Sequence, residues 1–355
     1  MPDCKDQRGS LVSAIKEKTP AQIHFVLWGR RFIFVQTENI ARPLVLTQED
    51  DMKDSGFEKD IDRRSFIYSM PGVAAVLASA PTVISGCESK KALTAGEVNK
   101  YLNSLGTEWV DLSKTVDTFK SPGPEIEVKG IAVAWMSYTW ALERALELGC
   151  NLFVTHEPTY YNHWDNDEKI FRFESARKKR EFIEKSGLTI IRCHDVWDQY
   201  PEIGIPMAWG KLLELEGPIE GSGYYYVYDG KAQAAGLIAG KIAARVAALG
   251  QPGVQFIGPE DKPVNRIVLG TGAITPMFHF IEELGADMAI CSDDGFTYWR
   301  DGAFAIDSEF PVAIVNHPVS EEYGMKLLAE HLAGKYPQVP VHHIPQRCMY
   351  KIFNA

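Results

Sequence analysis

Beyond about residue 95, short runs of apolar, largely β-branched residues alternate with longer stretches in which apolar residues recur every three or four positions. Short apolar runs are typical of buried strands, and the longer spacing is typical of amphipathic helices. The pattern predicts strands at 131–134, 152–155, 189–193, 267–269, 288–291 and 312–315. It predicts helices at 95–105, 140–148, 174–185 and 278–284. This alternation predicts an α/β fold in which helices cover the strands.

Two of these stretches resemble each other closely enough to indicate an internal repeat. Residues 131–151 end in Ala-Leu-Glu-Leu-Gly-Cys-Asn before a predicted strand, and residues 267–287 end in Ile-Glu-Glu-Leu-Gly-Ala-Asp before another. They align without a gap at an offset of 136, which matches Gly149 with Gly285. Each glycine fits the left-handed position that commonly ends a helix.

A second matched pair follows at an offset of 123. Both copies read strand, histidine, three residues, carboxylate, first as His194 and Asp198 and then as His317 and Glu321. Two ordered matches predict two pseudo-symmetric α/β subdomains, about 95–210 and 232–355, which meet at a metal-binding crevice.

The part of the chain before this body has the features of an export signal. Arg63 and Arg64 precede an apolar run over 68–86 that is rich in small residues and ends just before Cys87. Paired arginines, a weakly hydrophobic stretch and a cysteine after small residues predict a twin-arginine signal with a lipobox. The alternative is a buried helix or a single membrane span, which Pro71 and Pro81 disfavour. We therefore expect an exported periplasmic or cell-envelope lipoprotein, held at the membrane only through a lipid on Cys87.

The position of the paired arginines predicts how the chain is divided. Met52 begins a natural start just upstream of them, so we expect residues 1–51 to be an over-long gene start. Residues 52–86 would then be the signal, and 87–355 the working domain.

Composition and charge narrow the function classes. The 355 residues are 45% hydrophobic and carry a net charge of −10, and residues 1–86 hold equal numbers of acidic and basic side chains. The whole net charge therefore belongs to the working domain, which argues against nucleic acid as a partner. The six cysteines include no C-x-x-C pair, so neither a zinc knuckle nor a disulfide framework is indicated.

The candidate chemistry follows predicted strands, where ligands of such sheets gather. The candidate metal ligands are His156, Glu157, Asp198, His317 and Glu321, with His194 as a proton shuttle or second-shell group. Imidazole and carboxylate donors suit divalent zinc, iron, manganese, nickel or cobalt, and several carboxylates can bridge two cations that activate water. Each residue also has a purely structural interpretation. Glu321 could be no more than a helix cap, Asp198 could start a turn, and a lone histidine could be a hydrogen-bonded surface residue.

Other features carry less weight. His163 follows the first motif and could line a pocket or belong to a polar aromatic loop. Asp293 and Asp294 could reach the pocket or form a turn with Gly295. Residues 269–272, Leu-Gly-Thr-Gly, lack the Lys-Ser/Thr ending of a phosphate loop and could cradle an anion or only make a turn. No G-x-S-x-G elbow is present, which disfavours a serine hydrolase.

The motifs taken in order resemble a known family. Thr155-His156-Glu157-Pro158, His194-x-x-x-Asp198 and Asn316-His317-x-x-Ser-Glu321 resemble the Nif-three-like dinuclear metal-centre proteins, also labelled GTP cyclohydrolase 1 type 2-like. The resemblance implies two similar α/β subdomains, and metal ligands at His156, Asp198, His317 and Glu321. Glu157 stands where the family pattern has a second histidine, which implies an altered metal preference. The resemblance further implies a homo-oligomeric ring, in many members a hexamer.

We therefore expect a metal-dependent hydrolase that holds two divalent transition-metal ions and acts on a small molecule, with nucleotide-like compounds among the candidates. The alternative is a non-catalytic metal-binding ring or scaffold anchored at the membrane. Both predict bound metal, so only turnover separates them.

Overall fold

The computed structural model describes residues 24–28, 31–35 and 92–353. An antiparallel pair, β1 (His24–Trp28) and β2 (Arg31–Val35), belongs to the unit Met1–Ile84, and the rest belongs to Ser85–Ala355. The predicted signal arginines Arg63 and Arg64 and the predicted lipidation site Cys87 lie outside the described residues. Every candidate metal ligand lies in the second unit.

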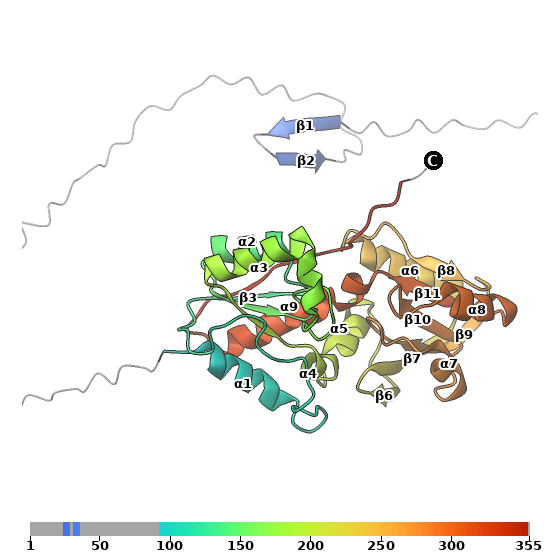
Figure 1. Cartoon of the computed structure of the whole chain (residues 1–355). Coiled ribbons are helices and arrows are strands. Elements are labelled where there is room, and N and C mark those ends of the chain that lie inside the picture. Colours follow the sequence, from blue (N-terminus) through green and yellow to red (C-terminus); the bar gives the residue numbers. More distant parts are fainter. Residues whose placement is uncertain (1–23, 29–30, 36–91, 354–355) are drawn as a thin grey trace, which may run out of the picture. The chain divides into compact units, whose positions relative to one another are not determined.

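The first sheet of this unit, of which β3 is labelled in Figure 1, has four parallel strands in the order β12-β3-β4-β5. They are β3 (Ile131–Ala134), β4 (Leu152–Thr155), β5 (Thr189–Arg192) and β12 (Val341–His343). Alternate residues of these strands enter two separate cores. One core packs against α2 (Thr139–Glu147) and α3 (Glu174–Ser186), and the other against α1 (Ala95–Leu105) and α9 (His317–Lys335). Helices therefore cover both faces, as buried parallel strands require.

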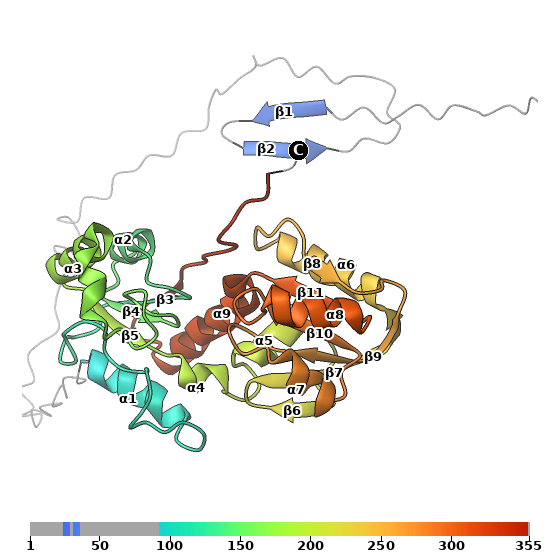
Figure 2. The ribbon, with the colours of Figure 1, turned by 45° about the vertical axis from the view of Figure 1, so that its right-hand side comes forward.

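The second sheet has six strands in the order β6-β7-β9-β10-β11-β8, of which β9, β10 and β11 are parallel (Figure 2). The strands are β6 (Glu220–Ser222), β7 (Tyr225–Ala234), β8 (Gln255–Ile257), β9 (Pro263–Leu269), β10 (Met288–Ser292) and β11 (Val312–Val315). One face packs against α5 (Ile205–Leu212) and α6 (Ala235–Ala247), and the other against α7 (Met277–Glu282) and α8 (Ala303–Asp307).

The predicted repeat is present in the structure. β3-β4-β5 and β9-β10-β11 have the same order and direction, and the register pairs Ile131 with Leu152 and Ile267 with Met288. The offset of 136 is therefore preserved in three dimensions. Gly149 and Gly285 have φ values of 76° and 60°, as predicted for residues that follow a helix. This confirms the expectation of two similar α/β subdomains.

The longest described helix, α9, joins the two subdomains. Pro318 lies at its amino end, as the sequence predicts, and Val319 packs in the core of the second sheet. Further along, Leu328 and Leu332 pack in the core of the first sheet. After α9 the chain adds β12 beside β3, so the last of the described strands completes the first sheet and not the second. The first sheet therefore contains one strand from the carboxyl-terminal half of the chain, which the predicted division into 95–210 and 232–355 does not include.

Three short elements complete the described part: the 3₁₀ turn η1 (Glu168–Arg172), the helix α4 (Asp195–Asp198) and the π-helical turn η2 (Tyr298–Gly302). Among the described residues, no helix has the length and apolar character needed to cross a bilayer.

Candidate metal centre

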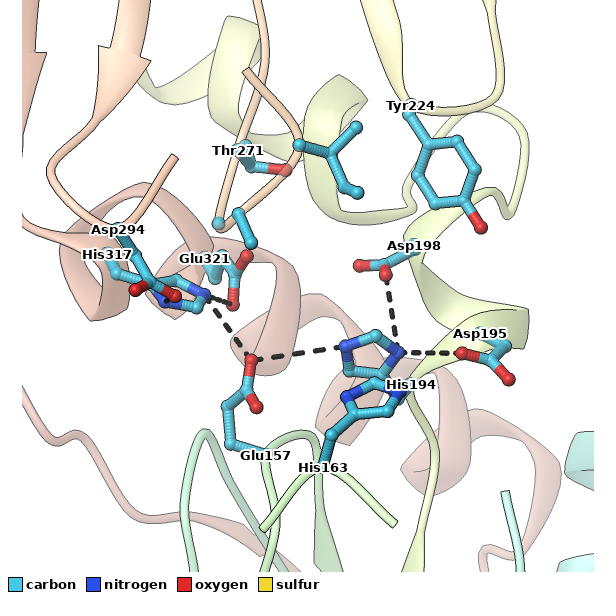
Figure 3. Close-up of a pocket in the computed structure, with 13 residues that line it drawn as sticks. Glu157, His163, His194, Asp195, Asp198, Tyr224, Thr271, Asp294, His317 and Glu321 are labelled. Atoms are coloured by element: carbon cyan, nitrogen blue, oxygen red, sulfur yellow. Dashed lines mark hydrogen bonds and ion pairs between the residues drawn. The ribbon is translucent and has the colours of Figure 1, made fainter. Parts of the chain in front are cut away.

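The candidate ligands converge in a crevice between the two sheets. His156 and Glu157 follow β4, Asp198 ends α4, and His317 and Glu321 lie in the first turns of α9. All five lie in one cluster together with His194. Figure 3 shows all of these residues except His156 around a cavity of about 300 Å³. The structure therefore brings the five candidate ligands and His194 together.

His156 is fully buried, and its surroundings define the state of both ring nitrogens. Nδ1 lies 3.1 Å from the carbonyl oxygen of Cys193, which can only accept, so Nδ1 carries the hydrogen. Nε2 is then the nitrogen that faces Asp198 Oδ1 at 3.3 Å and Glu321 Oε2 at 3.4 Å. Nε2 forms no hydrogen bond with any described residue. A buried imidazole nitrogen that faces carboxylate oxygens can hold a proton there or, in its place, a metal cation.

His317 repeats this arrangement in the second subdomain. Its Nδ1 lies 3.3 Å from Asp294 Oδ2, and its Nε2 lies 3.0 Å from Glu321 Oε2 and 3.3 Å from Glu157 Oε1. Nε2 is again buried and without a hydrogen-bond partner among the described residues. Glu321 therefore faces both imidazoles with the same oxygen.

The titration behaviour of the cluster shows how strongly it attracts positive charge. Burial lowers the pKa of His156, but the carboxylates of Asp198 and Glu321 outweigh it and raise the pKa to about 9. Burial also lowers the pKa of His317, and Glu321, Asp294 and Glu157 together raise it well above its usual value. Burial raises the pKa of Glu157, but the neighbouring histidines hold that pKa well below its usual range. Three packed carboxylates thus require a compensating cation, either protons on the histidines or metal ions.

The donor atoms form two groups that could each hold a metal ion, with ligand atoms within 4.8 Å of one another. One group is His156, Asp198 and Glu321, and the other is Glu157, His317 and Glu321. Each contains one imidazole and two carboxylates, and Glu321 belongs to both. A shared carboxylate between two such groups fits a pair of cations, and the oxygen-rich donor set favours harder ions than an all-imidazole site would.

His194 lies at the edge of these groups. Its Nδ1 is 2.8 Å from Asp195 Oδ1 and 3.4 Å from Asp198 Oδ2, and its ring stacks on that of His156 with centroids 4.6 Å apart. Its Nε2 lies 4.0 Å from Glu157 Oε1 at the cavity wall, and these two residues with His156 form a third possible ligand group. Asp195 fixes the Nδ1–H tautomer and leaves Nε2 as the free, proton-accepting nitrogen.

Several supporting residues were not recognised from the sequence. The indole nitrogen of Trp135 donates to Glu321 Oε2 at 2.7 Å, which holds the shared carboxylate in place. Gly272 lies against the ligands, and a Cβ there would be 2.5 Å from Glu321 Oε1 and 2.8 Å from His317 Nε2. Trp135 directly follows β3, so its position at a strand end was the signal available for it.

The features that the sequence left open are now assigned. His163 lines the cavity, and its ring makes an edge contact with His194. Asp294 also lines the cavity beside His317, whereas Asp293 accepts hydrogen bonds from the His317 backbone N–H at 2.9 Å and from Asn316 Nδ2 at 2.8 Å. Gly272 of the Gly-Thr-Gly stretch lies against the Glu321 carboxylate, which makes that position unsuited to an anion.

Fold and site together define a class: α/β proteins with two similar subdomains that enclose a histidine–carboxylate cluster able to hold metal. The sequence model of the Duf34/NIF3 (NGG1p interacting factor 3) family matches residues 122–348, and the chain belongs to this family. A comparison with curated protein sequences found no match.

Solved structures share the fold at low sequence identity. A hypothetical protein of Staphylococcus aureus is 16% identical with a TM-score of 0.60, over 74% of this chain and 100% of its own. A Bacillus cereus protein related to NIF3 is 12% identical with a TM-score of 0.59, over 75% of this chain and 99% of its own. Reduced HcgD from Methanocaldococcus jannaschii is 15% identical with a TM-score of 0.53, over 72% and 98% of the two chains.

Proposed function

We propose that this protein is a metal-dependent hydrolase that binds two divalent transition-metal ions and acts on a small molecule. The observation that carries the proposal is the pair of buried imidazole nitrogens, on His156 and His317, that face the shared Glu321 carboxylate without a hydrogen bond to any described residue. His156, Asp198 and Glu321 would hold one cation, and Glu157, His317 and Glu321 the other. Bound in pairs, such ions polarise the substrate and lower the pKa of water.

The chain's own residues supply the proton chemistry. His194 has its Nδ1 beside the Asp195 carboxylate and its Nε2 free at the cavity wall. A histidine oriented by a carboxylate is the usual arrangement of a general base, because the carboxylate stabilises the imidazolium that forms. We assign His194 the role of accepting a proton from the attacking water and returning it to the leaving group.

The cavity lining indicates the chemical class of the substrate. Five carboxylates line it, and no lysine or arginine does among the residues that the structure describes. Burial raises the pKa of Asp195, but hydrogen bonding with His194 outweighs burial and holds that pKa below its usual range. Hydrogen bonding with His317 likewise holds the pKa of Asp294 below its usual range, against a smaller effect of burial. Both therefore stay ionised beside the reacting groups, so the described lining offers a phosphate no arginine or lysine, and only the metal ions themselves could bind one. We infer an uncharged or cationic small molecule, so a nucleotide would bind through its base and ribose.

Three further properties are proposed from the sequence. The paired Arg63 and Arg64 and the small-residue ending before Cys87 support export by the twin-arginine route and a lipid anchor in the cell envelope. The family resemblance supports a homo-oligomeric ring. The net charge of −10 supports the absence of a nucleic-acid partner.

Metal analysis of the purified protein tests the metal centre. We expect one to two transition-metal equivalents per chain, and loss of more than half of that metal in the double variant His156→Ala, His317→Ala. The matched control is His279→Ala, which removes a half-exposed histidine that pairs with Glu283 at 3.2 Å and belongs neither to the ligand groups nor to the cavity lining. Retention of more than half of the metal in the double variant would refute the assignment.

Turnover separates the enzyme from the scaffold. The metal-loaded protein is assayed against a panel of cyclic amides, nucleosides, nucleotides and phosphoesters. We expect hydrolysis of an uncharged substrate, abolished in His194→Ala while the metal content stays unchanged. No turnover over the whole panel would favour the scaffold, and loss of metal in His194→Ala would assign His194 to the ligand set.

A further inference from the structure

Beside the metal centre, the structure buries the guanidinium of Arg192 completely. Arg192 ends β5 with no exposed surface. A buried guanidinium is costly unless its N–H groups are bonded and its charge is compensated. Arg192 meets that requirement with three partners, all within the segment that follows β4.

These three contacts have a clear geometry. Nε donates to the carbonyl oxygen of His156 at 2.7 Å, Nη1 donates to the carbonyl oxygen of His163, and Nη2 lies 3.4 Å from Glu157 Oε2. The guanidinium thus ties both ends of the segment 156–163 to β5. Because the arginine fork is planar and rigid, it fixes the segment and the Glu157 carboxylate together.

The consequence for Glu157 is that its two oxygens have different tasks. Oε2 faces Arg192, and Oε1 faces the site, 3.3 Å from His317 Nε2. Among the described residues, Arg192 is also the one lysine or arginine that forms an ion pair with a candidate ligand carboxylate. Its positive charge offsets part of the repulsion between Glu157 and Glu321.

The second subdomain offers an internal comparison. The residue that matches Arg192 in the repeat is Val315, which is buried in an apolar core. The residue that matches Glu157 is Asp293, whose two oxygens bind the Asn316 side chain and the His317 backbone. Where the arginine is absent, the equivalent carboxylate is used for local structure and is not presented to the site.

We propose that Arg192 is a positioning residue that presents Glu157 Oε1 to the metal position formed with His317 and Glu321, and so determines whether that position is filled. The inference rests on the proposed metal centre. It predicts that Arg192 affects one of the two cation positions and acts through Glu157.

The test measures metal binding to the full-length protein, with Mn²⁺ as the probe. Stripped wild type, Arg192→Lys and Arg192→Gln are titrated calorimetrically, and bound metal is counted after dialysis. We expect both variants to bind the first equivalent as wild type does and the second at least about tenfold more weakly, the scale typical of residues that orient a ligand. The matched control is Arg266→Lys, because Arg266 likewise donates from Nε to a backbone carbonyl, that of Leu284 at 3.0 Å, and pairs with Glu220, but away from the site.

A double-mutant comparison distinguishes positioning from general damage to the fold. In a Glu157→Gln background, Arg192→Lys should have no further effect on the second equivalent, since its target is already removed. The inference would be overturned if both Arg192 variants bound two equivalents of Mn²⁺ as wild type does. It would also be overturned if Arg192→Lys weakened the second equivalent equally with and without Glu157. If Arg192→Gln does not fold, the result for Arg192→Lys, which keeps the positive charge, decides the test. Failure of the wild type to bind Mn²⁺, Fe²⁺, Zn²⁺, Ni²⁺ or Co²⁺ would instead overturn the metal centre itself.

Discussion

Replacing Gly272 by alanine should cause the loss of bound metal although every metal ligand is kept. The added Cβ would lie 2.5 Å from Glu321 Oε1 and 2.8 Å from His317 Nε2, closer than the 3.0 Å below which real Cβ contacts essentially do not occur. Glu321 must therefore move by at least about 0.5 Å, whereas metal sites tolerate deviations of roughly 0.2 Å in ligand distance. Because Glu321 belongs to both ligand groups, both cation positions are affected.

The cost in stability can be separated from the loss of metal. Gly272 has a φ of 53°, and a left-handed conformation costs an alanine roughly 1–2 kcal/mol. For a chain of this size that corresponds to a decrease in Tm of about 2–8 °C. The variant Gly149→Ala is a matched control, because Gly149 has a φ of 76° and a Cβ there would meet no heavy atom within 4 Å.

The assay combines metal counting with thermal unfolding of chelator-treated protein. Both variants should lose a similar amount of stability, but only Gly272→Ala should lose its metal. The reasoning would be refuted if Gly272→Ala kept the wild-type metal content, or if Gly149→Ala lost as much metal as Gly272→Ala.

Three further outcomes are expected. The pKa of His156 is raised to about 9, so its contribution to the stability of the metal-free protein is complete below about pH 6.5 and is lost as the pH rises through 9. Denaturant unfolding of chelated protein should show a decrease of about 3 kcal/mol between pH 6 and pH 9.5, and equal stability at the two values would contradict this. Trp135→Phe removes the 2.7 Å hydrogen bond to Glu321, so it should lower the free energy of unfolding by about 2 kcal/mol and weaken metal binding, with unchanged calorimetric affinity as the contrary result. Replacing Arg63 and Arg64 by lysine should retain the protein inside the cell, as cell fractionation would detect, and undiminished export would exclude the twin-arginine route.

Hydrophobic periodicity and the internal repeat were sufficient to predict most of the central strands of the fold. The strands at 131–134, 152–155 and 312–315 lie where their apolar runs predicted, because buried parallel strands leave continuous apolar segments. The strands β6, β8 and β12 are three residues each and partly exposed, so they have no comparable signal. The pairing of β12 with β3 is a long-range contact that no local pattern encodes.

The site was predicted as far as its residues follow the ends of strands. His156, Glu157 and His317 each follow a buried strand, and such positions in parallel sheets converge. Arg192 was not identified, because a cationic residue within an apolar strand gives no indication of its partners. Its role became visible only when the carbonyl oxygens of His156 and His163 were placed beside it.

The pairing of β12 with β3 also constrains the order in which the molecule can fold. During synthesis, the first subdomain can assemble β3, β4 and β5, but β12, the strand that completes its sheet, follows the whole second sheet in the chain. The helix α9, which brings His317 and Glu321 to the site, likewise comes after the second sheet. The first sheet therefore keeps an open edge, and the metal ligands stay apart, until the chain has been synthesised past α9 and β12. Loss of the segment after residue 335 should thus damage the first subdomain, although the second sheet separates the two in sequence.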